Sequence, residues 1–506
     1  MSSKVTSIGL KGLEGYRVTV EVQAVTGMNS IVIVGLPDAS VKESKQRITA
    51  AFHTLGYLIH HQKIIVNLSP AEQKKNGPLF DLPIAIGILC NLSEINIKIP
   101  ETTGFIGSLS LDGSIQAVEG MLAAILAAKK AGLKKLYLPY DENSPELNFN
   151  ELEIIFVKSL QDVIGHLSGK TIPQSFTSHQ TKSFLSNPYP DFDQIIGQTY
   201  AKFALEVAAA GEHHLFMTGP PGCGKSMLAE SFPSILPLLT NEQNLEMKSI
   251  YQLSGLTNQY PMVPPFRNPH HSSSGVSIIG GGQNPKPGEI SLAHYGVLFL
   301  DEMAEFPKKT LDMLRQPLET GSVTISRARS TVTYPASFIL IGAMNPCPCG
   351  YSGSKSHYCT CSPMQINSYQ NRISGPLKDR FDIFLSLTPV DLQVTSIEKQ
   401  ETSDLVRKRV KEARKRQYDR YGKEICNGRA SFQTLIKESF LSNQHQQLIQ
   451  RLAYKENWSN RTQIKIIRLA RTIADLQQKT EITEQNIWDA VKLNSHSNNK
   501  FLKIVK

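Results

Sequence analysis

Gly219-Pro220-Pro221-Gly222-Cys223-Gly224-Lys225-Ser226 follows the G-x-x-x-x-G-K-[ST] pattern of a phosphate-binding loop. Its glycines permit backbone angles closed to other residues, so successive N–H groups can turn inward around phosphate oxygens. Lys225 would then reach the β- and γ-phosphates, and Ser226 would ligate Mg²⁺. Because an apolar segment precedes the loop at 215–218 and a helix-like segment follows at 227–230, the stretch predicts a strand–loop–helix unit of an α/β nucleotide-binding domain.

Two other apolar segments end in polar residues that suit ATP hydrolysis. Val297–Leu300 leads into Asp301 and Glu302. Asp301 would hold Mg²⁺ through water, and Glu302 would polarise the attacking water. Phe338–Met344 leads into Asn345, which is placed to orient that water. Paired acids also occur as ordinary strand ends, but beside a phosphate loop they favour a hydrolytic site.

Length and composition favour about three domains and exclude a membrane protein. The chain has 506 residues, 40% of them hydrophobic, but it lacks the run of about 18 apolar residues that a membrane span needs. No signal peptide is evident at the polar N-terminus. Seven cysteines in such a chain indicate reduced thiols, so we expect a cytoplasmic protein.

The positive charge is concentrated in the last quarter of the chain. The formal net charge is +10, and residues 391–506 alone hold 23 Lys and Arg against 13 Asp and Glu, a difference of +10. The densest part runs from Arg407 to Arg420. In a nucleotide-driven protein a basic helix favours a polyanionic partner, most simply nucleic acid, whereas a solvated helix face is the alternative.

Composition and periodicity divide the chain into four parts. Residues 1–170 alternate strand-like and helix-like segments, 171–190 are a polar linker rich in Ser, Thr, Gln and Pro, 191–390 hold the nucleotide motifs, and 391–506 are helical and basic. The main segments expected as regular structure are strands at 16–22, 31–35, 63–68, 135–139, 297–300 and 338–344 and helices at 41–55, 120–131, 461–476 and 483–493.

Further motifs occur along nearly the whole chain. They are Gly35–Ala39, Val41–Ser44, Phe266–His271, Gly288–His294, Arg315–Glu319, Met344–Gly350, Arg372–Leu377 and Ala470–Leu476. Together they resemble the motifs of the magnesium-chelatase-like AAA+ proteins of the YifB/ComM family. The resemblance implies an α/β fold with a central AAA+ P-loop domain of three αβα layers and a C-terminal helical lid. It also implies a homohexameric ring that binds ATP and Mg²⁺ between subunits.

The resemblance assigns two arginines to this shared site. Arg380 resembles the arginine finger that enters the neighbour's site and stabilises transition-state charge. Arg461 resembles the second-sensor arginine of the lid, although Ser459-Asn460-Arg461 departs from the usual Ser-Ala-Arg. Arg468 and Arg471 are rival candidates for that role. A surface ion pair is the alternative for any of these side chains.

Two segments of the central domain resemble pore-facing elements of this family. Tyr251–Gly282 resembles the insertion in helix 2, and it carries His270 and His271. Without a third ligand at a familiar spacing, these histidines favour a structural or nucleic-acid-contacting role over metal binding. Gly321–Ala336 resembles a hairpin on which Arg327 and Arg329 share a face, as a passing phosphate backbone would require.

Four cysteines form two close pairs joined by a short loop. Cys347 and Cys349 are separated by nine residues from Cys359 and Cys361, and this loop includes glycines. Such pairs can converge on Zn²⁺, but the spacing of one residue within each pair is shorter than usual. Zinc binding and free thiols that pack a loop therefore stay as alternatives, while disulfides fit a cytoplasmic protein poorly.

The N-terminal part resembles the S5-like α/β proteolytic domain of Lon-type proteases. The resemblance lies in residues 76–79, 107–113 and 120–132. Lon proteases use a Ser–Lys dyad, and the matching positions here are Leu79 and Ala124. Since neither a nucleophile nor a base is present, we expect a scaffold without peptidase activity.

The resemblance implies an ATP-driven DNA motor that migrates branched recombination intermediates during natural transformation. Its partners would be single-stranded and branched DNA, further copies of the chain and recombination proteins. A chelatase-type motor that drives metal insertion into a tetrapyrrole is one alternative, although no integrin-like metal-binding domain is visible here. A protein-remodelling ATPase or assembly scaffold is the other.

Overall fold

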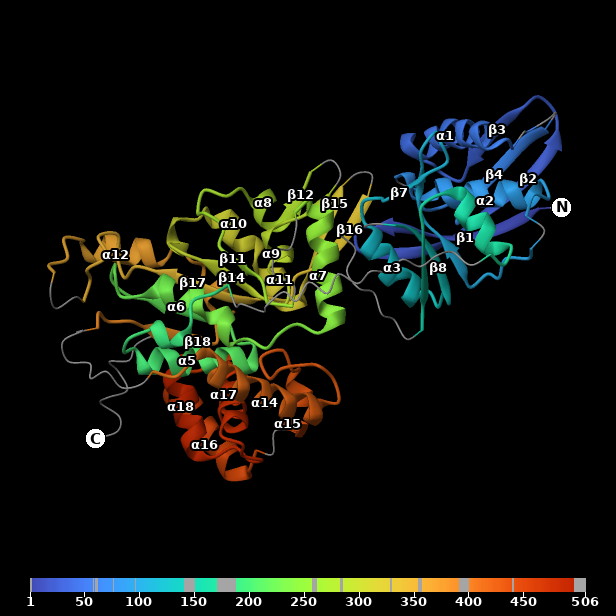
Figure 1. Cartoon of the computed structure of the whole chain (residues 1–506). Helices are drawn as coiled ribbons and strands as arrows, with labels where there is room; N and C mark the ends of the chain where they lie inside the picture. Colours follow the sequence, from blue (N-terminus) through green and yellow to red (C-terminus); the bar gives the residue numbers. More distant parts are fainter. Residues whose placement is uncertain are drawn as a thin grey trace. The chain divides into compact units, whose positions relative to one another are not determined.

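The computed structural model describes residues 2–57, 59, 62–75, 77–95, 97–140, 151–170, 188–256, 262–282, 285–327, 330–353, 357–390, 400–438 and 441–495. The chain forms two compact units, Met1–Phe184 with Lys248–Thr257 and Leu185–Met247 with Asn258–Lys506 (Figure 1). Most of the expected linker, at 171–187, lies outside the described residues. No helix among the described residues is long and apolar enough to cross a membrane.

The first unit is built on a seven-stranded mixed sheet. Its strand order is β3-β4-β2-β1-β5-β8-β9. The strands are β1 (Ser3–Lys11), β2 (Glu14–Thr26), β3 (Ser30–Val34), β4 (Gln62–Ser69), β5 (Thr103–Phe105), β8 (Lys135–Pro139) and β9 (Glu153–Val157). The alternation in β2 buries Val18, Val20 and Val22 on one face, because successive side chains of a strand point to opposite sides. The strands expected from periodicity are confirmed.

Among the described residues of Met1–Phe184, four helices and a short hairpin accompany this sheet. They are α1 (Ala39–Leu55), α2 (Asp81–Asn91), α3 (Met121–Lys130), α4 (Leu160–Leu167), β6 (Ser108–Leu109) and β7 (Ile115–Gln116), with the 3₁₀ helix η1 (Pro78–Phe80). Leu79 and Ala124, at the positions of the Lon dyad, are buried members of the apolar core. Both positions serve packing in this fold, and the absence of peptidase activity stays a prediction.

The second unit contains a parallel five-stranded sheet with the order β11-β14-β17-β10-β18. The strands are β10 (Leu215–Thr218), β11 (Phe266–Arg267), β14 (Val297–Leu300), β17 (Ile339–Met344) and β18 (Ile383–Ser386). All neighbours are parallel. The carboxyl ends of β10, β14 and β17 therefore lie at one edge, where α/β sheets bind ligands.

Short helices and two hairpins surround this sheet. They are α5 (Thr199–Gly211), α6 (Lys225–Ser231), α7 (Asn241–Ser254), α8 (Gly275–Ile279), α9 (Glu289–Leu292), α10 (Lys308–Met313), α11 (Arg315–Thr320), α12 (Pro363–Gln370), α13 (Gly375–Lys378), η2 (Phe192–Gln194), η3 (Phe232–Ile235), η4 (Met303–Glu305), β12 (Gly280–Gly281), β13 (Lys286–Pro287), β15 (Ser322–Arg327) and β16 (Ser330–Pro335). The β15–β16 pair confirms a hairpin between Gly321 and Ala336. Arg329 lies outside the described residues.

The C-terminal part is a helical lid (Figure 1). Its buried apolar residues belong to one core with those of the sheet domain. Its helices are α14 (Ser403–Tyr421), α15 (Phe432–Glu438), α16 (Asn443–Lys455), α17 (Asn460–Leu476) and α18 (Glu484–Asn494). Lid and sheet domain are also joined by buried polar contacts, because His213, just before β10, bonds both Asp382 and Thr472 of α17. The lid is thus built onto the amino ends of β10 and β18.

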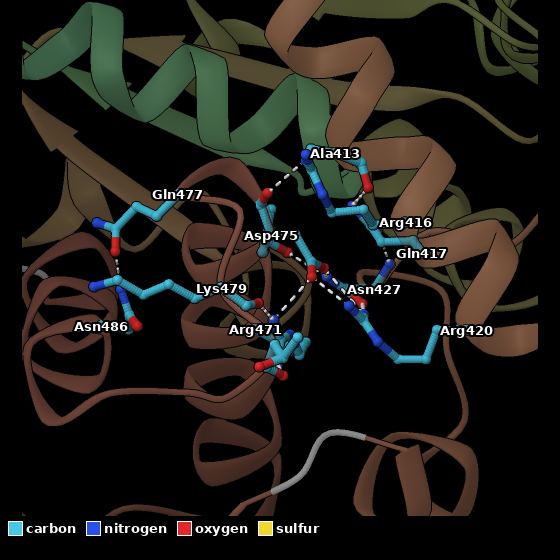
Figure 2. Close-up of polar contacts among 12 residues, drawn as sticks. Ala413, Arg416, Gln417, Arg420, Asn427, Arg471, Asp475, Gln477, Lys479 and Asn486 are labelled. Carbon is cyan, nitrogen blue, oxygen red and sulfur yellow. Dashed lines mark hydrogen bonds and ion pairs between the residues drawn. The ribbon is translucent and has the colours of Figure 1, made fainter.

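The arginines of α14 are partly buried and bond to other groups of the protein. Arg409 binds Glu206 and Glu401, and Arg414 donates to the Ala209 carbonyl and pairs with Glu212. Arg416 and Arg420 bond Asp475 of α17 (Figure 2). These guanidinium groups thus have partners within the chain, and a polyanionic partner for the helix stays a prediction. The exposed cations of α14 are its lysines, Lys408, Lys411 and Lys415.

Candidate nucleotide-binding site

The phosphate loop joins β10 to α6 and has the backbone that its sequence requires. Gly222 and Gly224 lie in the left-handed region with φ of 75° and 89°, which side chains other than glycine rarely adopt. A Cβ on Gly219 would lie 2.7 Å from Cys223 Sγ and 2.9 Å from the Leu387 carbonyl oxygen. The turn thus leaves the N–H groups at the start of α6 free of helical partners, as a nest for phosphate oxygens.

Lys225 lies across the mouth of this loop. Its Nζ donates to the carbonyl oxygens of Gly219 at 2.7 Å and Pro220 at 2.9 Å, and to Asn345 Oδ1 at 3.1 Å. Lys225 begins α6, after β10, and Asn345 follows the neighbouring strand β17, 120 residues later. The structure thus brings Lys225 and Asn345 together, and the part of Asn345 in orienting water at a bound phosphate stays a prediction.

Ser226 and Asp301 also meet at this edge. Ser226 Oγ donates to Asp301 Oδ2 at 3.0 Å, and Asp301 Oδ1 accepts the backbone N–H of Glu302 at 2.8 Å. A hydroxyl and a carboxylate from adjacent elements are the oxygen ligands that Mg²⁺ takes in such sites, directly or through water. The donor set therefore fits a Mg²⁺ ion beside a nucleotide phosphate.

Glu302 follows Asp301 in an uncommon backbone conformation. Its φ is 47°, in the left-handed region that few residues other than glycine adopt. His271 Nδ1 lies 3.6 Å from Glu302 Oε2. This contact was not expected from the sequence, which favoured a structural or nucleic-acid-contacting role for His271. The one signal in the sequence that concerned His271 was its place in a histidine pair within a motif, and this signal did not indicate Glu302 as its partner.

Arg380 and Arg461 converge on a single carboxylate oxygen. Arg380 reaches Glu319 Oε1 at 2.5 Å, and Arg461 reaches the same atom at 3.0 Å. The two arginines lie 81 positions apart in sequence, on the segment before β18 and at the start of α17. Their shared partner, at the end of α11, was not predicted, although Glu319 closes a motif singled out in the sequence.

The rival arginines of α17 have structural partners. Arg468 donates to the Ala430 carbonyl, and burial lowers its pKa. Arg471 is fully buried and pairs with Asp475 at 2.9 Å (Figure 2). Arg461, by contrast, keeps 56% of its side chain exposed. Of the three arginines, Arg461 is therefore the one placed to meet a ligand outside its own lid.

The four clustered cysteines come together directly after Asn345. The Sγ atoms of Cys347, Cys349 and Cys359 are 3.3 to 3.7 Å apart, and all four, with Cys361, lie within 4.8 Å of one another. The backbone N–H of Ser352 points at Cys347 Sγ at 3.2 Å. A hydrogen bond from the backbone of Tyr351 lowers the pKa of the Cys349 thiol to about 6.

Family models for magnesium chelatase match three successive parts of the chain. The model described as subunit ChlI of Mg-chelatase matches residues 20–142, and that for magnesium chelatase, subunit ChlI, matches 191–395. The model for the C-terminal part of this subunit matches 400–494.

Relatives match almost the full length. YifB of Salmonella typhimurium is 37% identical over 486 residues, which cover 95% of this chain and 94% of that protein. Competence protein ComM of Haemophilus influenzae is 37% identical over 488 residues, 95% of each chain. Lon protease 2 of Bacillus subtilis is 29% identical over 127 residues, or 25% of this chain and 22% of that protein.

The parallel sheet, the phosphate loop and the helical lid define an AAA+ ATPase of the magnesium-chelatase-like type. The expected fold class, including the Lon-like N-terminal α/β unit, is confirmed. Within this class the chain belongs to the YifB/ComM family.

Proposed function

We propose that this protein is an ATP-driven DNA motor that works as a homohexameric ring in the cytoplasm. Its task would be the migration of branched recombination intermediates during natural transformation, on single-stranded and branched DNA and alongside recombination proteins. The observation that carries the ATPase part is the convergence of Lys225, Ser226, Asp301 and Asn345 on one edge of the sheet. The DNA part is supported by the likeness to the competence protein ComM.

In this proposal each residue of the site has one task. The nest at 219–226 binds the phosphates of ATP, and Lys225 neutralises their charge. Ser226 and Asp301 would hold a Mg²⁺ ion, which would supply positive charge beside the γ-phosphate. Glu302 accepts the proton of the attacking water, and Asn345 orients that water. Arg380 and Arg461 stabilise charge on a nucleotide held by a neighbouring subunit.

ATP turnover with and without single-stranded and forked DNA tests this function. DNA should raise turnover or change the oligomeric state of the full-length protein. Lys225→Ala should abolish nucleotide binding, whereas Glu302→Gln should bind ATP and hydrolyse it slowly. If DNA changes neither turnover nor assembly, the DNA motor is excluded.

A chelatase-type ATPase is the second candidate, because the matching family models describe a magnesium chelatase subunit. Its turnover would depend on partner subunits and a tetrapyrrole instead of DNA. A protein-remodelling ATPase would respond to unfolded protein. The same turnover assay with these additions separates the three.

We also propose that Cys347, Cys349, Cys359 and Cys361 bind a structural Zn²⁺. A tetrahedral site with Zn–S bonds of about 2.3 Å places its sulfurs about 3.8 Å apart, close to the 3.3 to 3.7 Å between three of the thiols. Metal analysis of the reduced protein should find about one zinc per chain. A content below a few tenths of that would exclude the site.

A further inference from the structure

We propose that zinc at the four-cysteine cluster fixes Asn345 above the phosphate loop and thereby controls ATP hydrolysis without controlling ATP binding. The cluster is defined here as Cys347, Cys349, Cys359 and Cys361. This inference rests on the proposed roles of Asn345 and of zinc. It assigns the cluster a positioning task in the reaction, beyond holding its own loop together.

The segment that carries the cluster begins just after Asn345, and the helix that follows it returns to the residue next to Asn345. Cys347 follows Asn345 by two residues, and its side chain is fully buried. At the far end, Gln370 Nε2 donates to the Pro346 carbonyl at 3.0 Å. Both ends of the segment are therefore tied to the chain beside the residue proposed to orient the attacking water.

Helix α12 transmits the position of the cluster to this contact. Cys361 is followed at once by Ser362, the N-cap of α12, whose side chain accepts the N–H of Gln365 while Gln365 bonds back to Ser362. This capping box fixes the direction of the helix where it leaves the cluster. Gln370 is the last residue of the same eight-residue helix, so a shift of Cys361 would move the residue that holds the Pro346 carbonyl beside Asn345.

The cluster loop also packs against the tip of the phosphate loop. Gly350 has φ of 86°, and a Cβ at this position would lie 2.7 Å from Pro221 Cδ. Asn345 Oδ1 in turn accepts a hydrogen bond from Lys225. The cluster is thus in contact with the phosphate loop and continuous with the polar residue that faces it.

The position of the phosphate-binding backbone depends less on zinc than the position of Asn345 does. The nest is formed by the backbone of Gly222, Gly224 and the first turn of α6. These residues belong to one continuous segment that follows β10. Four thiols without a metal have no strong bonds among themselves, so the described parts of this loop, 347–353 and 357–361, gain freedom when zinc leaves. Loss of zinc should therefore displace Asn345 and leave most of the phosphate nest in place.

Full-length protein with and without zinc tests the inference. Zinc is removed with a thiol-reactive reagent, and the thiols are then reduced and reloaded with Zn²⁺. The metal-free protein should bind a non-hydrolysable ATP analogue within about twofold of the holoprotein, while kcat falls about 10- to 100-fold, as expected for a displaced catalytic group. Reloading should restore kcat, which excludes irreversible unfolding as the cause.

Substitutions provide a second route to the same answer. Cys361→Ser should lower zinc content and kcat together, whereas Cys90→Ser, a half-buried cysteine outside the cluster, should change neither. Combined with Asn345→Ala, Cys361→Ser should cause little additional loss, because both changes act on one group.

The outcomes distinguish a failure of the proposed zinc effect from a failure of the proposed role of Asn345. If Asn345→Ala hydrolyses ATP at the normal rate, the proposed role of Asn345 is wrong and the inference falls with it. If Asn345→Ala is slow but zinc-free protein is as fast as holoprotein, only the inference is overturned. The inference is also overturned if the losses of kcat in Cys361→Ser and Asn345→Ala multiply in the double variant. The same holds if the zinc-free protein loses ATP binding as strongly as it loses kcat.

Discussion

At the scale of single residues, buried charges of the lid converge on Asp475. This fully buried carboxylate pairs with Arg471 of its own helix and with Arg420 of α14, and it accepts a hydrogen bond from Asn427 at 2.9 Å (Figure 2). Its backbone carbonyl accepts from Arg416. One acid thus compensates two buried guanidinium groups, an arrangement whose stability depends on the presence of every member.

Asp475→Ala should lower the free energy of unfolding of the second unit by about 3 to 5 kcal/mol, because Arg420 and Arg471 are then buried without a counter-charge. Trp458 and Trp488, the two tryptophans of the chain, both lie in the lid. Urea unfolding followed by their fluorescence measures the loss. Asp419→Asn, an exposed acid on α14, is the control and should change little. A loss below 1 kcal/mol for Asp475→Ala would contradict the argument.

His214 should make the second unit sensitive to acid. Burial, with the charge of Arg429, lowers its pKa to about 3, and its Nδ1 accepts the N–H of Leu340 at 3.0 Å. In the unfolded chain His214 has its ordinary pKa near 6.5 and binds a proton below that pH, whereas in the folded chain it stays neutral down to about pH 3. The free energy of unfolding is therefore at its full value above about pH 6.5 and falls as the pH drops towards 3. Between pH 7 and 5 the loss from this group is about 2 kcal/mol.

The measurement compares urea midpoints at pH 7 and pH 5 for the wild type and for His214→Asn. The amide oxygen of Asn can accept the Leu340 N–H but does not titrate in this range. The difference between the two pH values should therefore be smaller in the variant. An equal difference in both proteins would mean that His214 does not contribute.

At the scale of elements, helix α14 demonstrates what composition alone cannot decide. Its positive charge is evident in the sequence, yet the structure divides that charge between arginines that bond the sheet domain and exposed lysines. Both types of residue occur within one helical turn. The division depends on carbonyl and carboxylate partners more than 200 positions away, such as Ala209 and Glu212 for Arg414.

Adjacent residues of α14 offer a matched test. Arg414→Gln removes two hydrogen bonds to the Ala209 carbonyl and the pair with Glu212, so it should destabilise the second unit by about 2 to 4 kcal/mol. Lys415→Gln should stay within about 0.5 kcal/mol of the wild type, since Lys415 is exposed. Thermal unfolding of both variants checks this, and similar melting temperatures for the two would refute the assignment of Arg414 to the interior.

The sequence predicted elements better than the contacts between loops. The apolar run at 297–300 is β14 to the residue, and the helix expected at 461–476 is α17 with one more residue, because burial on one face imposes a period that survives in the sequence. The mutual proximity of Asn345, Asp301 and Ser226 could be expected, since they follow neighbouring parallel strands or begin the helix after one. The contacts of His271 with Glu302 and of Arg380 with Glu319 depend on the paths of the irregular segments that carry His271 and Arg380, which have no such period.

At the scale of the whole molecule, the candidate site is divided into two sets of residues. Lys225 and Ser226 contact Asn345 and Asp301 of their own chain, whereas Arg380 and Arg461 contact Glu319. Among the described residues, neither of these two arginines has a bond to the chain's own phosphate loop. If both serve a neighbour's nucleotide, they must exchange the Glu319 carboxylate for a phosphate when subunits assemble.

Two inactive variants should therefore restore activity when mixed. Lys225→Ala subunits cannot bind ATP but supply Arg380, and Arg380→Ala subunits bind ATP but lack the finger. In rings mixed at equal amounts, about a quarter of the interfaces combine an intact nucleotide site with an intact finger, so ATPase activity should rise towards about a quarter of the wild-type value. Mixing Lys225→Ala with Glu302→Gln is the control, because both changes damage the same half of the site and no intact interface forms. Equal activity in the two mixtures would place Arg380 in the site of its own chain.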